Sequence, residues 1–257
     1  MSIKMQDVSY NYGHEDAIKK INLDFIPGQL VSLVGPNGAG KTTLLKLISG
    51  VLKPTSGQIH IYDQSSKKLS NKDRALLISL VPQNPNLPVE MGIADFIMLG
   101  RNPHLKLLQW ESAADFKIAQ ESIDLTEIDH LVQRKIGEVS GGERQRIMLA
   151  LALTQRSPIM LLDEPTSNLD ISHQTKVMSL IKKIHTQKSN AGATILSIHD
   201  LNTAAQFSDR VILLSEGSVA VDGTPEEVLT KNNIEAIYGS EVNIIPHPEH
   251  GSPLIIS

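Results

Sequence analysis

The stretch Leu30-Val31-Ser32-Leu33-Val34-Gly35-Pro36-Asn37-Gly38-Ala39-Gly40-Lys41-Thr42 decides the fold of this chain. Its first five residues form a short, mainly apolar run, which is typical of a strand buried on both faces of a parallel sheet. The next eight residues fit the pattern G-x-x-x-x-G-K-[ST], whose glycines allow backbone N–H groups to turn inward around a phosphate chain. A helix is expected over residues 42–48, ended by Gly50, and its N-terminus adds positive potential. The stretch therefore predicts a phosphate-binding loop between a strand and a helix.

Two side chains of this loop have distinct expected roles. Lys41 places a positive charge beside the β- and γ-phosphates of a nucleotide, and the hydroxyl of Thr42 is a suitable ligand for Mg²⁺. A glycine-rich turn that matches the pattern by chance is the alternative. The strand before the loop and the helix after it favour phosphate binding, because they are the context in which this motif works.

Further apolar patterns predict two kinds of sheet. Short unbroken apolar runs, typical of buried parallel strands, lie at residues 78–81, 159–162, 194–198 and 211–214. In the first sixty residues apolar side chains recur nearly every second position, at Ile3, Met5, Val8, Tyr10, Leu23, Phe25, Ile59 and Ile61. Such alternation predicts an antiparallel sheet with one face in water. The fold class is therefore α/β, with a mixed parallel core sheet and an N-terminal antiparallel β subdomain.

Helical patterns occupy the segments between these strands. We expect helices over residues 141–153 and 174–185, a helix start at Thr224-Pro225-Glu226-Glu227 and a hairpin turn at Glu216-Gly217. We interpret the chain as a single domain, residues 1–257. Its core comprises residues 1–83 and 140–223, an inserted helical subdomain spans residues 84–139, and C-terminal helices and a tail follow over residues 224–257.

The composition of the 257 residues excludes several classes of protein. Lys and Arg number 24 against 28 Asp and Glu, and this net charge of −4 argues against a nucleic-acid partner. The absence of cysteine excludes disulfides and Cys-ligated metals. The longest apolar run, residues 147–153, is far shorter than the roughly 20 residues that span a bilayer. His247 and His250 lack a third ligand nearby, so we expect solvated side chains there. We expect a soluble chain without a signal peptide.

Two carboxylates, Asp163 and Glu164, follow the apolar run at residues 159–162. A carboxylate at the end of a parallel strand beside a phosphate loop suits Mg²⁺, which is the role expected of Asp163. Glu164 is placed to polarise an attacking water as general base. The alternative is that both carboxylates are solvated at the end of a strand. The phosphate loop elsewhere in the chain argues against this alternative.

The segment Ser140-Gly141-Gly142-Glu143 has two compatible interpretations. Ser-x-x-Glu before a helix is a capping box, which requires no ligand. The paired glycines leave bare N–H donors at a helix N-terminus, which suits an anion, although glycine costs helix stability. In isolation the segment favours the capping box.

The order of these motifs resembles the ATP-binding cassette (ABC) ATPase family. Besides the phosphate loop, the resemblance includes Gln83, the stretches at residues 140–145, 161–165 and 167–170, and His199 after an expected strand. It extends from Tyr12 to about Gly223. Val139 and Glu143 replace the Leu and Gln usual in the family, and both are common variants, so we expect activity.

The resemblance implies ATP and Mg²⁺ as cofactors and a role for each site residue. The implied catalytic residues are Glu164, His199 and Gln83, and the implied metal ligands are Thr42, Gln83 and Asp163. The implied nucleotide-binding residues are Tyr12, Gly35, Pro36, Asn37, Gly38, Ala39, Gly40, Lys41, Thr42, Thr43, Ser140, Gly141, Gly142, Glu143 and Asp170. Tyr12 would stack on adenine, His199 would hold the γ-phosphate, and Asp170 would communicate across a dimer.

The resemblance also implies a head-to-tail homodimer, in which the Ser140 segment of one subunit binds the γ-phosphate of ATP on the other. Each single residue has a structural alternative. Tyr12 would be an aromatic at a strand edge, His199 a hydrogen-bonded loop residue, and Asp170 the N-cap of the following helix.

Two further stretches resemble the cassette subunits of iron-chelate, haem and vitamin B12 importers. They are Leu99-Gly100-Arg101-Asn102-Pro103-His104 and Ser167-Asn168-Leu169-Asp170-Ile171-Ser172-His173-Gln174. A helix end followed by a Pro-containing turn is the structural alternative for the first. The resemblance implies a permease that contacts the segment from Asn84 to Trp110, a substrate-binding protein acting indirectly, and a peripheral place on the cytoplasmic face of the inner membrane.

Other classes fit less well. Soluble ABC ATPases that act on ribosomes or DNA usually carry two cassettes or a long inserted coiled coil. Guanine-specific GTPases need Asn-Lys-x-Asp, whereas Asn71-Lys72-Asp73-Arg74 has its Asp one position early. A small-molecule kinase leaves the Ser140 segment and His199 unexplained. An exporter or another class of importer stays open, because its cassette chemistry would be the same.

Overall fold

The strand that precedes the phosphate loop, β3 (Leu30–Val34), lies inside a six-stranded sheet with the order β10-β9-β3-β8-β7-β6. The computed structural model describes residues 2–13, 15–167, 169–187 and 192–256. The other strands of this sheet are β6 (Ile78–Val81), β7 (Ile159–Asp163), β8 (Thr194–Ser197), β9 (Arg210–Ser215) and β10 (Ser218–Gly223). All are parallel except β10, which pairs antiparallel with β9. Glu216 and Gly217 form the turn between them with φ values of 46° and 78°, as the sequence predicts.

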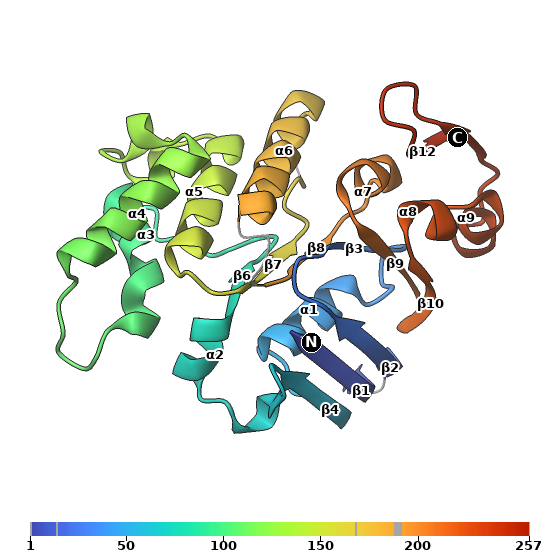
Figure 1. Ribbon diagram of the computed structural model, residues 1–257, viewed down its shortest axis with the longest axis horizontal. Coiled ribbons are helices and arrows are strands. Elements are labelled where there is room, and N and C mark those ends of the chain that lie inside the picture. Colours follow the sequence, from blue (N-terminus) through green and yellow to red (C-terminus); the bar gives the residue numbers. More distant parts are fainter. Residues whose placement is uncertain (1, 14, 168, 188–191, 257) are drawn as a thin grey trace.

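The N-terminal strands form a separate antiparallel sheet with the order β2-β1-β4-β5. Its strands are β1 (Ile3–Tyr12), β2 (Glu15–Phe25), β4 (Ser56–Ile61) and β5 (Gln64–Ser65). Helix α1 (Lys41–Ser49) lies between the two sheets (Figure 1), and its Leu44 and Leu47 share a core with Phe25 and Leu33. Gly50 ends α1 with a φ of 76°, which favours glycine.

The other face of the six-stranded sheet is covered by helices (Figure 1). They are α5 (Gly141–Thr154), α6 (Ile171–Gln187) and the lobe formed by α3 (Ile93–Met98), η2 (Leu99–His104), α4 (Ala113–Thr126), η3 (Asp129–Leu131) and η4 (Ile136–Glu138). One hydrophobic cluster joins Ile97 and Ile123 of the lobe to Leu149 of α5 and Leu162 of the sheet. This shared core confirms the α/β fold class with an inserted helical lobe, while the subdomain boundaries stay predictions.

The C-terminal part contains more structure than the predicted helices and tail. After α7 (Leu201–Phe207), the helices α8 (Pro225–Val228) and α9 (Lys231–Tyr238) precede a hairpin of β11 (Asn243–Pro246) and β12 (Pro253–Ile256). The Asn202 side chain accepts from the backbone N–H of Ile255 at 2.7 Å and donates to its carbonyl at 3.0 Å. At the tip of this hairpin the rings of His247 and His250 stack with their centroids 3.7 Å apart. Within the described residues, every helix is too short or too polar to cross a bilayer.

Candidate nucleotide-binding and hydrolysis site

The phosphate loop bends sharply between β3 and α1. Gly35 has a φ of 145°, and a Cβ there would lie 2.2 Å from the carbonyl oxygen of Leu214, so only glycine fits. The Lys41 ammonium is buried and donates to the carbonyl oxygens of Gly35 at 2.7 Å and Pro36 at 3.0 Å. Burial lowers the pKa of Lys41, although nearby Glu164 opposes this shift. The Lys41 ammonium therefore lies inside the phosphate loop.

Hydrogen bonds between side-chain oxygen atoms join the phosphate loop to the end of β7. The hydroxyl of Thr42 donates to Oδ1 of Asp163 at 2.9 Å, and Ser197 donates to the same oxygen at 2.8 Å. Asp163 is buried. A hydroxyl and a carboxylate are hard oxygen ligands of the kind that Mg²⁺ prefers, so the predicted metal ligands Thr42 and Asp163 fit the ion. Sequence reasoning missed Ser197, whose signal is a hydroxyl near the end of an apolar run.

Glu164 occupies a left-handed backbone conformation with a φ of 48°. A non-glycine residue adopts it at a cost of about 1–2 kcal/mol, and such strain often occurs at functional sites. Its backbone N–H donates to the Ser197 hydroxyl at 2.8 Å. Its Oε2 accepts from the Gln83 amide, and its Oε1 lies 2.5 Å from Nε2 of His199. The three predicted catalytic residues therefore meet at the carboxyl ends of three parallel strands.

A pocket of about 320 Å³ lies over the phosphate loop. Its lining residues are Tyr12, Glu15, Asp16, Ala17, Asn37, Gly38, Ala39, Gly40, Lys41, Thr42, Thr43, Glu164 and His199. Tyr12 is 52% exposed at the rim, with its ring packed edge-on against Tyr10 at 4.9 Å between centroids. An exposed aromatic ring beside a phosphate loop has the size and place to contact a nucleotide base.

The Ser140 segment lies outside this pocket. Among the described residues that line the pocket, none belongs to the segment. The capping box is present. Ser140 N–H donates to Oε2 of Glu143 at 2.8 Å, and Glu143 N–H donates to the Ser140 hydroxyl at 3.4 Å. The hydrogen bonds that the backbone N–H and the hydroxyl of Ser140 donate to the Glu143 carboxylate lower the pKa of Glu143. Gly141 is exposed, and a Cβ there would meet no atom within 4 Å. This helix N-terminus is therefore open to a group that another molecule supplies.

Asp170 acts as the N-terminal cap of α6, the structural alternative for this residue. Its Oδ1 accepts from the backbone N–H of His173 at 2.9 Å and lies 2.8 Å from that residue's Nδ1. These bonds lower the pKa of Asp170 to about 2. Asn168 of the same motif lies outside the described residues.

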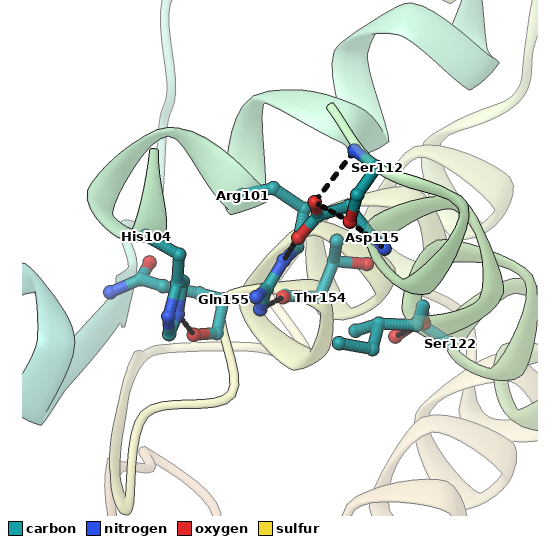
Figure 2. A network of polar contacts seen from close by, with 8 residues as sticks. Arg101, His104, Ser112, Asp115, Ser122, Thr154 and Gln155 are labelled. Carbon is teal, nitrogen blue, oxygen red and sulfur yellow. Dashed lines mark hydrogen bonds and ion pairs between the residues drawn. The ribbon is translucent and has the colours of Figure 1, made fainter. Parts of the chain in front are cut away.

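Two side chains of the stretch at residues 99–104, Arg101 and His104, bond to groups elsewhere in the helical lobe and α5, as Figure 2 shows. The buried guanidinium of Arg101 donates to Oδ1 of Asp115 at 2.8 Å and to the carbonyl oxygen of Thr154 at 2.9 Å. His104 Nε2 lies 2.8 Å from the carbonyl oxygen of Gln155. Arg101 and His104 thus join η2 to the C-terminal end of α5. Gly100 and Arg101 are buried, whereas Leu99, Asn102 and His104 are exposed.

Comparison with known proteins identifies the family to which this chain belongs. A family model described as ABC transporter matches residues 18–167. The chain is 36% identical to the hemin import ATP-binding protein HmuV of Bordetella avium (strain 197N), over 100% of this chain and 99% of the relative. It is 33% identical to the ferric enterobactin transport ATP-binding protein FepC of Escherichia coli (strain K12), over 99% and 93%. It is 36% identical to the petrobactin import ATP-binding protein FpuC of Bacillus anthracis, over 96% and 90%.

Solved structures show the same similarity. A metal-chelate type ABC transporter in an inward-facing conformation aligns with a TM-score of 0.85 and 25% identity, over 99% of this chain and 96% of the other. The dimeric cassette MJ0796 bound to ADP and Pi aligns with a TM-score of 0.75 and 31% identity, over 87% and 98%. The chain belongs to the ABC transporter family, as one of its ATP-binding, ATP-hydrolysing subunits.

Proposed function

We propose that two copies of this chain power the uptake of a metal chelate, such as a ferric siderophore or haem, or of cobalamin, through a membrane permease. The proposal for hydrolysis rests on the carboxylate of Glu164, which lies between Gln83 and His199 beside the phosphate loop. The proposal for the cargo rests on relatives named for hemin, ferric enterobactin and petrobactin that align along nearly their whole length.

In the proposed mechanism, backbone N–H groups of the loop and Lys41 bind the phosphates of ATP. Thr42, Asp163 and Gln83 would hold Mg²⁺, which neutralises phosphate charge when bound. Once ATP is present, one oxygen of Glu164 leaves its protein partner and accepts a proton from the attacking water. Before this proton transfer His199 has turned from Glu164 to the γ-phosphate, where it stabilises the charge that develops as the water oxygen bonds to the γ-phosphorus and the bond to ADP breaks. Tyr12 would stack on the adenine.

The proposed assembly is a head-to-tail homodimer. The exposed N-terminus of α5, with Ser140, Gly141 and Gly142, would reach the γ-phosphate of ATP on the other subunit. Support comes from the position of this segment outside the chain's own pocket and from the similarity to a dimeric cassette. Asp170 would lie near the dimer interface while it caps α6.

The proposed permease contact lies within the segment from Asn84 to Trp110. Asn84 and Pro85 line a groove of about 240 Å³ together with Gln83, so a permease segment seated there would adjoin a catalytic residue. In the proposed assembly the chain would lie peripherally on the cytoplasmic face of the membrane, with a substrate-binding protein acting on the other side.

A pull-down from native membranes with a tagged Glu164→Gln chain tests the proposal. Mass spectrometry identifies the proteins recovered, and the ATPase of the wild-type complex is measured with ferric chelates, haem and cobalamin. We expect a polytopic permease and an ATPase that one of these cargoes stimulates. Recovery of ribosomal or DNA-repair proteins from a membrane-free fraction would contradict the transport function. Stimulation only by an unrelated cargo would indicate another class of ABC transporter.

A further inference from the structure

Three large apolar side chains are exposed on one turn between η2 and α4. Leu107 is 94% exposed, Leu108 is 93% exposed and Trp110 is 86% exposed. Contiguous exposed apolar side chains on a soluble domain commonly mark an interaction site. ATP binding and hydrolysis use none of these three residues.

The turn is held in place by hydrogen bonds, and one of its residues has a strained backbone. The backbone N–H of Gln109 donates to the carbonyl oxygen of Lys106 at 3.0 Å, and the Gln109 side chain accepts from the N–H of Lys106 at 3.0 Å. Leu108 has a φ of 63°, a left-handed conformation that a branched side chain adopts only at an energetic cost. The hydrogen-bonded turn therefore presents Leu107 and Leu108 to the surroundings despite this cost.

Exposed lysines lie on this turn and on two elements linked to it. Lys106 belongs to it, and Lys72 of α2 (Asn71–Leu77) donates to the carbonyl oxygen of Leu105 at 2.5 Å. Lys67 and Lys68 lie on the adjacent η1 (Ser66–Lys68), which Arg74 of α2 joins through its bond to the Ser66 carbonyl at 2.8 Å.

Acidic groups near these lysines are fewer. The exposed Asp63 lies shortly before η1, Asp73 bonds to Ser70, and Glu111 follows the turn. The lysine surface is therefore locally positive on a chain whose net charge is −4.

This surface lies at the end of the sheet opposite the nucleotide pocket. At the C-terminal end of α5, the Gln155 side chain donates to the carbonyl oxygens of Ala75 and Ile78. Ile78 is the first residue of β6. Glu164 and His199, in contrast, follow the carboxyl ends of β7 and β8. A partner bound at the turn would therefore leave the ATP site and its dimer face free.

We propose that this surface, made of residues 105–111 with Lys67, Lys68 and Lys72, binds an anionic lipid surface. The lysines contact the phosphates of lipid headgroups, while Leu107, Leu108 and Trp110 enter the interface between headgroups and acyl chains. Trp and Leu beside Lys are typical of membrane-interface anchors. The apolar part of this surface is three side chains, far fewer than the roughly 20–30 residues a side of a specific protein interface. The inference rests on the proposed function only for the presence of a membrane beside the chain.

Trp110 is the only tryptophan of the chain, so its fluorescence reports on this surface directly. The full-length wild-type chain is mixed with permease-free vesicles of phosphatidylcholine, with or without phosphatidylglycerol. We expect a shift of Trp110 emission to shorter wavelength and co-sedimentation with the anionic vesicles. Both should weaken as salt rises, because salt screens the lysines.

Variants separate the apolar and the charged contributions. Leu107→Ser/Leu108→Ser should weaken vesicle binding at least about tenfold, and Lys67→Gln/Lys68→Gln should weaken it about fivefold per lysine. Ile245→Ser is the apolar control, since its strand β11 pairs with β12, which lies at the opposite end of the molecule in Figure 1. Lys19→Gln/Lys20→Gln is the charge control, on β2 at the other edge of the small sheet.

Binding of a fluorescent ATP analogue in solution is measured on every variant. Its retention distinguishes loss of lipid binding from loss of the nucleotide site, and so from failure of the proposed function. An unchanged Trp110 spectrum with anionic vesicles at low salt would overturn the proposal. A shift seen only with permease reconstituted in uncharged lipid would also overturn it, in favour of a protein partner.

Discussion

Oε1 of Glu164 lies 2.5 Å from Nε2 of His199, across the gap between the ends of β7 and β8. The other carboxylate oxygen accepts from Gln83. A general base needs an oxygen directed at the attacking water. The contact with His199 must therefore break before hydrolysis, and arrival of a γ-phosphate gives His199 an alternative partner. In the proposed mechanism this exchange would link ATP binding to exposure of the base.

Replacing His199 tests that exchange. His199→Ala removes the group proposed to stabilise charge on the γ-phosphate, and we expect kcat to fall about 10²-fold. The KM for ATP should change much less, because the phosphate loop binds the ground state. Steady-state ATPase kinetics measure both quantities. An ATPase rate equal to or above that of the wild type would mean that His199 only restrains Glu164.

Lys41→Ala should abolish nucleotide binding. The ammonium is the buried cation of the loop, and its loss removes the charge that attracts the β- and γ-phosphates. Titration with a fluorescent ATP analogue measures the affinity. Lys46→Ala, one helical turn later on α1, is the matched control and should bind normally. Retained affinity in Lys41→Ala would contradict the assignment of the phosphate loop.

Arg101→Ala should destabilise the fold by about 3–5 kcal/mol. The change leaves the buried carboxylate of Asp115 without its cation and the Thr154 carbonyl without a donor. Urea unfolding gives the free energy of unfolding. Arg156→Ala breaks a solvent-exposed pair with Glu121 and should cost only about 0–1 kcal/mol. Equal losses in the two variants would show that the buried network contributes little.

Asp115 makes stability depend on acidity. Hydrogen bonds from Ser112 and Arg101 lower its pKa to about 2 from an ordinary value of 3.8. Since the folded pKa is the lower one, the stabilisation is complete above the unfolded pKa and is lost as the pH falls towards about 2. The free energy of unfolding, measured from pH 5 to pH 2 (roughly the range of the shift), should fall less steeply in Asp115→Asn. Asp124→Asn controls for loss of a surface charge on α4, and a slope like that of the wild type in Asp115→Asn would refute the assignment.

The sheet and the phosphate loop were predictable because local physics determines them. The five residues before Gly35 are too apolar for a surface segment, and the glycines after them suit little besides a phosphate-binding turn. Asp163, Glu164 and His199 follow apolar runs, so a parallel sheet brings them to one edge. Their roles in catalysis stay predictions.

Features that depend on distant contacts were beyond the sequence patterns. The buried Arg101 bonds to groups on α4 and α5 that lie 14 and 53 positions away, and no periodicity encodes that pairing. The C-terminal hairpin escaped prediction because each strand has a proline at one end, Pro246 and Pro253, which argues against strand structure. The Asn202 side chain bonds to the backbone N–H and carbonyl of Ile255 in β12, as a neighbouring strand would.

The most direct test of ATP hydrolysis through Glu164 is a paired measurement on the wild-type chain and Glu164→Gln. ATP affinity comes from titration, and the rate of hydrolysis comes from a single turnover at saturating ATP with Mg²⁺. Glutamine keeps the size of the side chain but cannot accept the proton, so we expect unchanged affinity and a hydrolysis rate lower by about 10²–10⁴-fold. A turnover rate near that of the wild type would contradict the role of Glu164 as general base.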